Sequence, residues 1–181
     1  MTTDRTAPTR VTMRGIRKAY PGVLALDDVD FDLEEGEVHA LLGENGAGKS
    51  TLIKVLTGAL ERDAGEIILQ GKPVSFATTG DAQEAGISTV YQEVNLIPAM
   101  SVTQNLTLEK TGGQFGVISW RKARAQAQAK LDRLALEVDL EQAVGSYSVA
   151  VQQMIAIARA LDEDTKVLVL DEPTASLDAE E

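Results

Sequence analysis

The chain has 181 residues, enough for one ordinary domain, and 44% of them are hydrophobic. Its formal net charge is −11, from 17 basic and 28 acidic residues, which argues against nucleic acid as a partner because such surfaces are usually basic. Cysteine is absent, so a disulfide framework is excluded and nothing indicates export. No apolar run approaches the roughly 20 residues that span a bilayer, and residues 1–10 are polar, unlike a secretory signal. We therefore expect a soluble chain, or a soluble subunit of a larger assembly.

The first part of the chain predicts a disordered tail and then strands joined by turns. We expect the tail at residues 1–9, a strand at 11–20 and a Pro-Gly turn at 21–22. A half-buried strand of alternating character is expected at 29–33 and a second turn at 34–36. Residues 38–42 are nearly all apolar, which predicts a buried parallel strand with His39 as an ordinary strand residue.

The following elements alternate between helix and strand. The spacing of Leu52, Val55 and Leu56 predicts a helix over residues 49–56, which Gly58 ends. Beyond it we expect an edge strand with a turn at residues 67–73, a strand at 87–91, a loop at 111–116 and a helix at 119–136. A buried strand is expected at 167–170, preceded by a helix with an apolar stripe made of Met154, Ile157, Ala158 and Leu161. Such alternation predicts an α/β domain with a parallel sheet.

A glycine-rich loop between the predicted strand and helix carries the clearest chemistry. Its residues are Gly43, Glu44, Asn45, Gly46, Ala47, Gly48, Lys49, Ser50 and Thr51, the pattern of a phosphate-binding loop. Backbone N–H groups in such a turn and the positive end of the following helix replace the water around phosphate groups. Lys49 supplies a charge for the β- and γ-phosphates of ATP, and Ser50 supplies a hydroxyl for Mg²⁺.

Two acids follow the last predicted strand. Asp171 at the strand end can hold Mg²⁺, and Glu172 can orient or deprotonate an attacking water. The alternative is a solvated pair of loop acids, which the phosphate loop makes the weaker interpretation.

Together with further motifs, these residues make the chain resemble the ATP-binding cassette (ABC) ATPases from about Val11 to its end. Residues 171–178 look like the second nucleotide motif and the Asp loop of that family. Gln92 matches the glutamine of its glutamine loop, and Tyr20 matches the aromatic residue that stacks on adenine. Ser148 stands where the family signature falls. Tyr20 could also be an ordinary strand aromatic, and Gln92 a solvated loop residue.

Within the family, the chain looks most like the N-terminal cassette of monosaccharide importer ATPases. The stretches that carry this likeness are residues 20–26, 36–42, 92–98 and 152–160. The signature departs from the usual Leu-Ser-Gly-Gly-Gln, because residues 147–151 read Tyr-Ser-Val-Ala-Val. The chain also ends before the family's switch histidine and contains no second cassette.

The resemblance implies a partial ABC nucleotide-binding domain over residues 10–181, truncated at its C-terminus. It implies a parallel core, an N-terminal antiparallel β portion and a helical subdomain at about residues 96–160. Lys49 and the loop amides would hold ATP, while Ser50, Asp171 and Gln92 would serve Mg²⁺. Gln92 and Glu172 would act in catalysis, with Glu172 as the general base, and Ser148 would complete the ATP site of a second cassette.

The implied partners are a second cassette, transmembrane permease subunits and, indirectly, an extracytoplasmic sugar-binding protein. The implied location is peripheral, on the cytoplasmic side of the membrane. Two other interpretations stay open: a nucleotide-binding fragment without turnover, and a non-transport cassette ATPase. Because the strand that carries the switch histidine is missing, we expect residues 1–181 alone to hydrolyse little ATP and to associate through unpaired strands. Arg121, Lys122 and Arg124 are most simply a solvated helix face.

Overall fold

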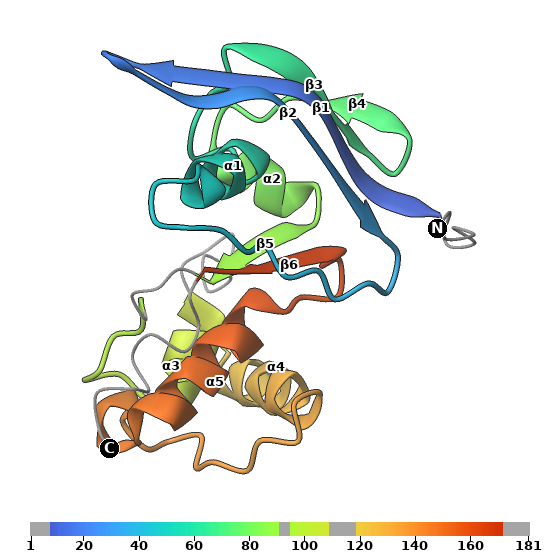
Figure 1. The fold of residues 1–181 in the computed structure, drawn as a ribbon. Coiled ribbons are helices and arrows are strands. Elements are labelled where there is room, and N and C mark those ends of the chain that lie inside the picture. The colour runs from blue at the N-terminus through green and yellow to red at the C-terminus, as the bar shows by residue number, and fades with distance from the viewer. Residues whose placement is uncertain (1–7, 91–94, 109–118, 172–181) are drawn as a thin grey trace. The chain divides into compact units, whose positions relative to one another are not determined.

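The computed structural model describes residues 8–90, 95–108 and 119–171. The chain divides into two compact units, Met1–Ile87 and Ser88–Glu181, and each is described by itself below. Figure 1 shows the elements in chain order.

The N-terminal unit contains an antiparallel sheet with the strand order β2-β1-β3-β4. Its strands are β1 (Thr9–Tyr20), β2 (Val23–Glu34), β3 (Ala64–Leu69) and β4 (Lys72–Val74). The first two predicted strands and the turn between them are confirmed. The prediction of an edge strand at residues 67–69 is wrong, because β3 pairs with β1 on one side and β4 on the other. Pro73 lies in β4 at the edge of the sheet, where a missing N–H disrupts no central ladder.

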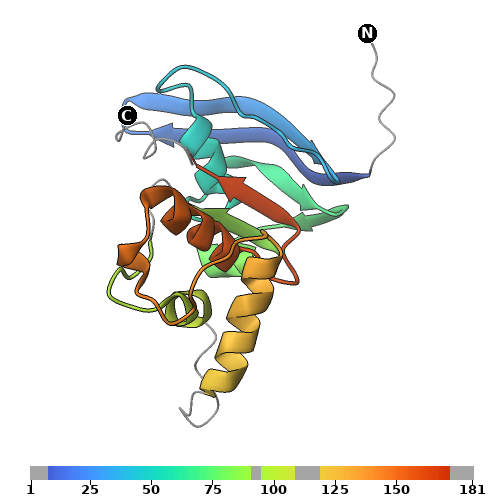
Figure 2. The same ribbon diagram turned by 90° about the horizontal axis from the view of Figure 1, so that it is seen from below.

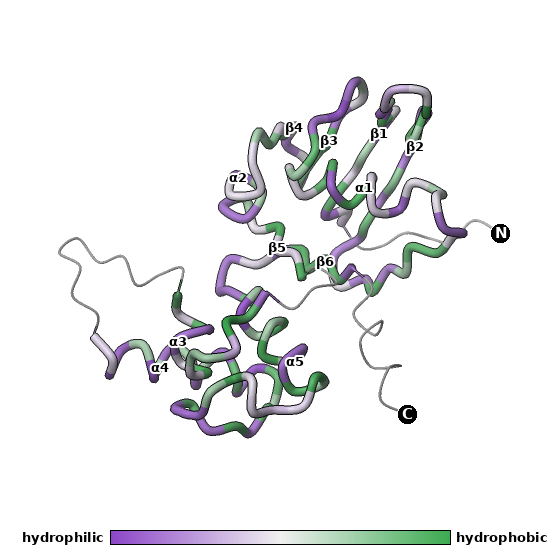
Figure 3. Tube along the Cα trace, turned by 90° about the vertical axis from the view of Figure 1, so that its left-hand side faces the viewer, coloured by the Kyte–Doolittle hydropathy of each residue, from purple (hydrophilic) through white to green (hydrophobic). Residues whose placement is uncertain are grey.

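One face of this sheet is apolar because side chains alternate along each strand. Val11 and Met13 of β1 and Ile67 and Leu69 of β3 are all buried. Hydrophobic and hydrophilic stretches alternate along these strands in Figure 3. Helix α1 (Lys49–Leu56) buries three apolar residues at helical spacing, Leu52, Val55 and Leu56, so the predicted helix is confirmed. Helix α2 (Thr79–Glu84) starts at a capping box formed by Thr78 and Asp81.

The segment at residues 38–42 differs from the prediction. It has no regular secondary structure, and Val38 and Leu42 are 99% and 87% exposed. The ring of His39 lies beside the carboxylate of Glu37 and edge-on to Phe31, with ring centroids 5.0 Å apart. An apolar run becomes a buried strand only where other strands pair with it, and no strand among the described residues pairs with this one. The expected buried parallel strand is therefore wrong for this structure.

The C-terminal unit combines a two-stranded sheet with helices. Strand β5 (Ile87–Val90) pairs with β6 (Val167–Leu170). Among the described residues of this unit, the α-helices are α3 (Val102–Thr107), α4 (Trp120–Asp132) and α5 (Val149–Ala160). A short 3₁₀ helix, η2, spans Val144–Ser146. Figure 2 shows the same elements from below. The predicted strand at residues 167–170 is confirmed. The strand predicted at residues 87–91 is present over residues 87–90, and residue 91 lies outside the described residues, as does the loop predicted at residues 111–116.

The long predicted helix ends earlier than expected, at Asp132 rather than residue 136. Ala135 adopts a positive φ of 49°, a conformation that an α-helix cannot continue through. None of the helices in the described ranges combines the length and the hydropathy needed to cross a bilayer.

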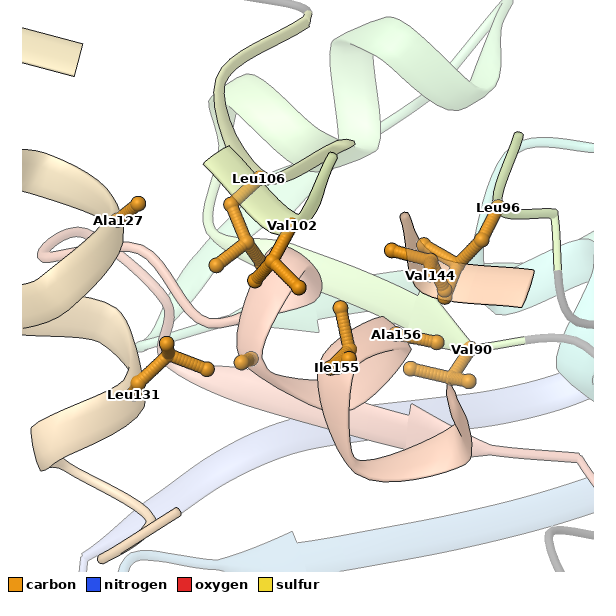
Figure 4. Close-up of a cluster of buried hydrophobic side chains, with 10 residues drawn as sticks. Val90, Leu96, Val102, Leu106, Ala127, Leu131, Val144, Ile155 and Ala156 are labelled. Atoms are coloured by element: carbon orange, nitrogen blue, oxygen red, sulfur yellow. The ribbon is translucent and has the colours of Figure 1, made fainter. Parts of the chain in front are cut away.

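The core of this unit lies between the three helices and β5. Figure 4 shows Val90, Leu106, Leu131 and Ile155 among its side chains, each contributed by a different element. The apolar stripe predicted for α5 is only partly right. Of the four predicted residues only Ala158 is buried, and the others that α5 buries are Gln153, Ile155 and Ala156. Because α5 packs against both α3 and α4, its buried face is rotated from the one that the sequence suggested.

Asn105 organises the start of α3 from a fully buried position. Its Oδ1 accepts the N–H of Ile97 at 2.8 Å. Its Nδ2 donates to the carbonyls of Ile97, Met100 and Ser101 at 3.1, 3.3 and 3.1 Å. One buried side chain thus accepts the N–H of Ile97 and gives a second donor to three carbonyls that also accept backbone N–H groups.

We predict that Asn105→Ala destabilises the protein by about 1–3 kcal/mol, because a fully buried side chain and its four hydrogen bonds to the backbone are lost together. Urea unfolding followed by circular dichroism measures this change. The control is Gln128→Ala, which removes an exposed bond to Asp132 and is expected to change stability by less than about 0.5 kcal/mol. Equal effects of the two substitutions would contradict the role given to Asn105.

Candidate nucleotide-binding site

The predicted phosphate loop is a tight turn that leads directly into α1. The N–H of Ala47 donates to the carbonyl of Glu44 at 3.1 Å, which closes the turn. Gly46 and Gly48 both have a φ of 85°, the left-handed conformation that glycine adopts without steric cost. Gly48 is the N-cap of α1, and its carbonyl accepts the first helical bond from Leu52 at 2.9 Å. The turn therefore delivers the chain into the helix at its positive end.

Gly48 also lies against the backbone of β2. A Cβ at this position would be 2.7 Å from the carbonyl oxygen of Ala25 and 3.0 Å from a methyl of Leu26. Ala25 is the extra residue of a β-bulge, since Lys18 pairs with Leu26 while Ala19 pairs with Leu24. The end of the loop is thus seated on the strand that follows the Tyr20 turn.

Lys49 and the start of α1 give the loop groups that attract an anion. The ammonium of Lys49 donates to the carbonyls of Gly43 and Glu44 at 2.7 and 3.0 Å, which holds it across the turn. The first turn of α1 contains no acidic residue, so no side chain of that turn opposes the positive end of the helix dipole. Ser50 is exposed beside Lys49 and has its hydroxyl at the helix start. Loop amides, a cation and a hydroxyl form a donor set that suits a phosphate with Mg²⁺.

Tyr20 lies at the tip of the hairpin between β1 and β2. It pairs with Val23 across the turn formed by Pro21 and Gly22. Tyr20 is 41% exposed and Val23 62%, so neither belongs to the core. An ordinary core aromatic would be buried here, and an exposed ring is available for stacking. Stacking of Tyr20 on adenine stays a prediction.

The other described candidates lie in the C-terminal unit. Asp171 follows β6 directly, and its N–H donates to the carbonyl of Val90 at 3.0 Å, which extends the pairing of β6 with β5. The backbone of Asp171 is therefore held at the carboxyl end of a strand. Gln92 and Glu172 lie outside the described residues, and their predicted roles remain predictions.

Ser148 caps the N-terminus of α5. Its Oγ accepts the N–H of Val151 at 3.4 Å, and its own O–H is left as a donor. Tyr147, which stands in place of the usual leucine, binds through its hydroxyl to the N–H of Asp139 and to the side chain of Gln142, at 2.9 and 3.1 Å. The altered signature thus keeps a serine hydroxyl at a helix N-terminus, held by contacts of its own.

The sequence predicted most of these positions but not the contacts that fix them. Nothing in the sequence indicated that Gly48 rests on Ala25, or that the carboxylate of Asp63 accepts the N–H of Ala19 near the end of β1. The predicted solvated face of α4 agrees with the structure: Arg121, Lys122 and Arg124 are exposed. A hydrogen bond from Arg124 to Glu141 at 2.6 Å raises the pKa of Arg124.

A glycine turn that leads into a helix beginning Lys-Ser, in an α/β chain, defines the class of phosphate-loop nucleotide-binding proteins. Residues 26–175 match the ABC transporter family. The chain belongs to this family.

Named relatives are similar over nearly the whole chain. The fructose import ATP-binding protein FruK of Bifidobacterium longum is 54% identical over 173 residues, which are 94% of this chain and 34% of FruK. The ribose import ATP-binding protein RbsA 1 of Rubrobacter xylanophilus is 50% identical over 169 residues, 93% of this chain and 34% of RbsA 1. The chain therefore spans about a third of the length of the curated relatives it matches.

The solved structures that are similar to this chain include cassettes of ABC transporters. The structure of cbiO1 from Clostridium perfringens, part of the ABC transporter complex cbiONQ, has a TM-score of 0.79 at 28% identity, covering 93% of this chain and 67% of cbiO1. A dimeric ATP-binding cassette, MJ0796, bound to ADP and Pi has a TM-score of 0.74 at 26% identity, covering 94% of this chain and 77% of that one.

We predict that Gly48→Ala destabilises the protein more than Gly46→Ala does. Both residues have the same φ, so both substitutions carry a left-handed strain of about 1–2 kcal/mol. Only at Gly48 does the new Cβ also meet a backbone oxygen, whereas nothing lies within 4 Å of it at Gly46. Such overpacking adds about 1–3 kcal/mol. Thermal unfolding without nucleotide measures the difference, and equal melting temperatures would contradict the contact with Ala25.

Proposed function

We propose that the chain is the ATP-binding part of an importer ATPase, and that it binds Mg-ATP at residues 43–51. The observation that carries the proposal is the turn at Gly46–Gly48, which joins a cation, amides and a helix N-terminus in one place. The names of FruK and RbsA 1 support sugar import as the process that ATP hydrolysis drives.

In this proposal the residues of the chain divide the chemistry between them. The loop amides and Lys49 hold the phosphates in line for attack by water, where positioning and charge stabilisation supply most of the catalysis. Ser50, Asp171 and Gln92 provide the oxygen atoms that Mg²⁺ prefers, and the ion would neutralise charge on the phosphates. Glu172 accepts the proton of the attacking water. Tyr20 stacks on the adenine ring.

The partners proposed for the whole protein follow from the same relatives. A second cassette, in the same polypeptide or in a dimer, would place Ser148 against the ATP bound by its neighbour, and the dimeric cassette with ADP and Pi supports such pairing. Permease subunits would bring the chain to the cytoplasmic side of the membrane, with a sugar-binding protein on the other side. The negative net charge supports a protein partner rather than nucleic acid.

We predict that Lys49→Ala weakens ATP binding at least tenfold, about 1.4 kcal/mol, because the site loses its mobile cation. Isothermal titration calorimetry with Mg-ATP on the protein as its gene encodes it measures the change. Lys54→Ala is the matched control, since Lys54 is exposed in the last turn of the same helix. If Lys49→Ala binds ATP as tightly as Lys54→Ala does, the loop is not the nucleotide site.

Glu172→Gln is expected to keep ATP binding and to lower turnover at least a hundredfold, the usual contribution of a general base. The amide keeps the size of the side chain but cannot accept the proton. Phosphate release under saturating ATP measures turnover, with Glu163→Gln, an exposed glutamate before β6, as the control. Near-normal hydrolysis by Glu172→Gln would place the base elsewhere.

A further inference from the structure

On the side of β1 that faces β3, the end of the strand is bound by a carboxylate rather than by strand pairing. Strand β3 begins at Ala64, which pairs with Arg17, so regular pairing with β1 stops before Tyr20. Asp63 continues it by two further bonds. Its N–H donates to the carbonyl of Arg17 at 2.9 Å, and its Oδ2 accepts the N–H of Ala19 at 2.7 Å. The side chain of Asp63 therefore takes the place of the missing ladder carbonyl.

Lys18 fixes this carboxylate in turn. Its ammonium donates to the other oxygen, Oδ1, at 2.7 Å, and the Lys18 side chain is only 15% exposed. The hydrogen bonds from Lys18 and from the Ala19 N–H lower the pKa of Asp63, so the carboxylate is charged throughout the neutral range. Both of its oxygens are thus committed to consecutive residues of β1, directly before Tyr20.

On the other strand of the hairpin, the bulge at Ala25 lies against Gly48 of the phosphate loop. A bulge locally disrupts the pairing of two strands and bends the bulged strand. The hairpin tip at Tyr20 lies beyond that disruption, where two pairs, Ala19 with Leu24 and Tyr20 with Val23, join β1 to β2. Asp63 restrains the tip from the β1 side, opposite the contact of β2 with the loop.

We propose that Asp63, held by Lys18, is a positioning residue for the adenine ring of ATP, because it fixes the strand end at which Tyr20 lies relative to the phosphate loop. This inference rests on the proposed binding of ATP at residues 43–51. Its consequence is specific: Asp63 contributes to the recognition of the base and not to that of the phosphates.

The test compares ATP with inorganic tripolyphosphate, which has the phosphates but no base. Affinities of both for the protein as its gene encodes it are measured in the presence of Mg²⁺. Asp63→Ala is expected to weaken ATP binding about fivefold, part of the contribution of one stacked base, and to leave tripolyphosphate within about twofold of the wild type. Asp63→Asn keeps an acceptor for the Ala19 N–H and is expected to recover most of the ATP affinity.

Asp81→Ala is the matched control, since that carboxylate also accepts two backbone N–H groups, of Ala77 and Thr78, and its pKa is also lowered by them. It caps α2 and is expected to leave the ratio of the two affinities unchanged. In a Tyr20→Ala background, Asp63→Ala should have no further effect on the ratio, because the residue acts through Tyr20.

An unchanged ratio in Asp63→Ala, whether both affinities fall together or neither falls, overturns the proposal, and so does an additive effect with Tyr20→Ala. If Asp63→Ala does not fold, Asp63→Leu replaces it, since it keeps the approximate size of the side chain and removes the acceptor for the Ala19 N–H, and an unchanged ratio there has the same meaning. Failure of the proposed function looks different: the wild-type protein would then bind neither ATP nor tripolyphosphate in a way that depends on Lys49.

Discussion

The close approach of Gly48 to the carbonyl of Ala25 is the constraint on which the proposed site depends. Because Gly48 is left-handed and has no Cβ, the end of the phosphate loop rests on the backbone of β2. The Cβ of any other residue at this position would lie 2.7 Å from the carbonyl oxygen of Ala25. From this point α1 starts with Lys49 and Ser50 in its first turn. The same strand continues to the hairpin that carries Tyr20, so the contact links the elements proposed to bind phosphate and base.

The C-terminal unit fixes its candidate residues by ordinary secondary-structure rules. Asp171 is positioned because its N–H continues the pairing of β6 with β5, and Ser148 because a serine suits the N-cap of a helix. Buried Asn105 and the apolar core between α3, α4 and α5 stabilise the helices around them. Substitutions in this core are therefore expected to act on stability first, and on chemistry only through it.

Local patterns predicted what depends on local physics. The glycine loop, the helix with Leu52 and Val55 and the hairpin at Pro21 need only backbone preferences and periodicity, and all are present. Predictions from the sequence were wrong where the structure of a segment depends on the elements that pair with it or pack against it. An apolar composition at residues 38–42 could not tell that no described strand would pair there, and the stripe on α5 could not show that two helices pack against it. Asp63 was missed because nothing in the sequence marks an aspartate whose partners are some 45 residues away.

The central claim, that ATP binds at residues 43–51, is tested most directly by hydrogen–deuterium exchange of individual backbone amides with and without Mg-ATP. Exchange is expected to slow at the loop amides and at the first turn of α1, since those N–H groups would donate to phosphate, and Lys49→Ala is expected to abolish the slowing. Protection that appears only outside residues 43–52, or that persists unchanged in Lys49→Ala, would contradict it.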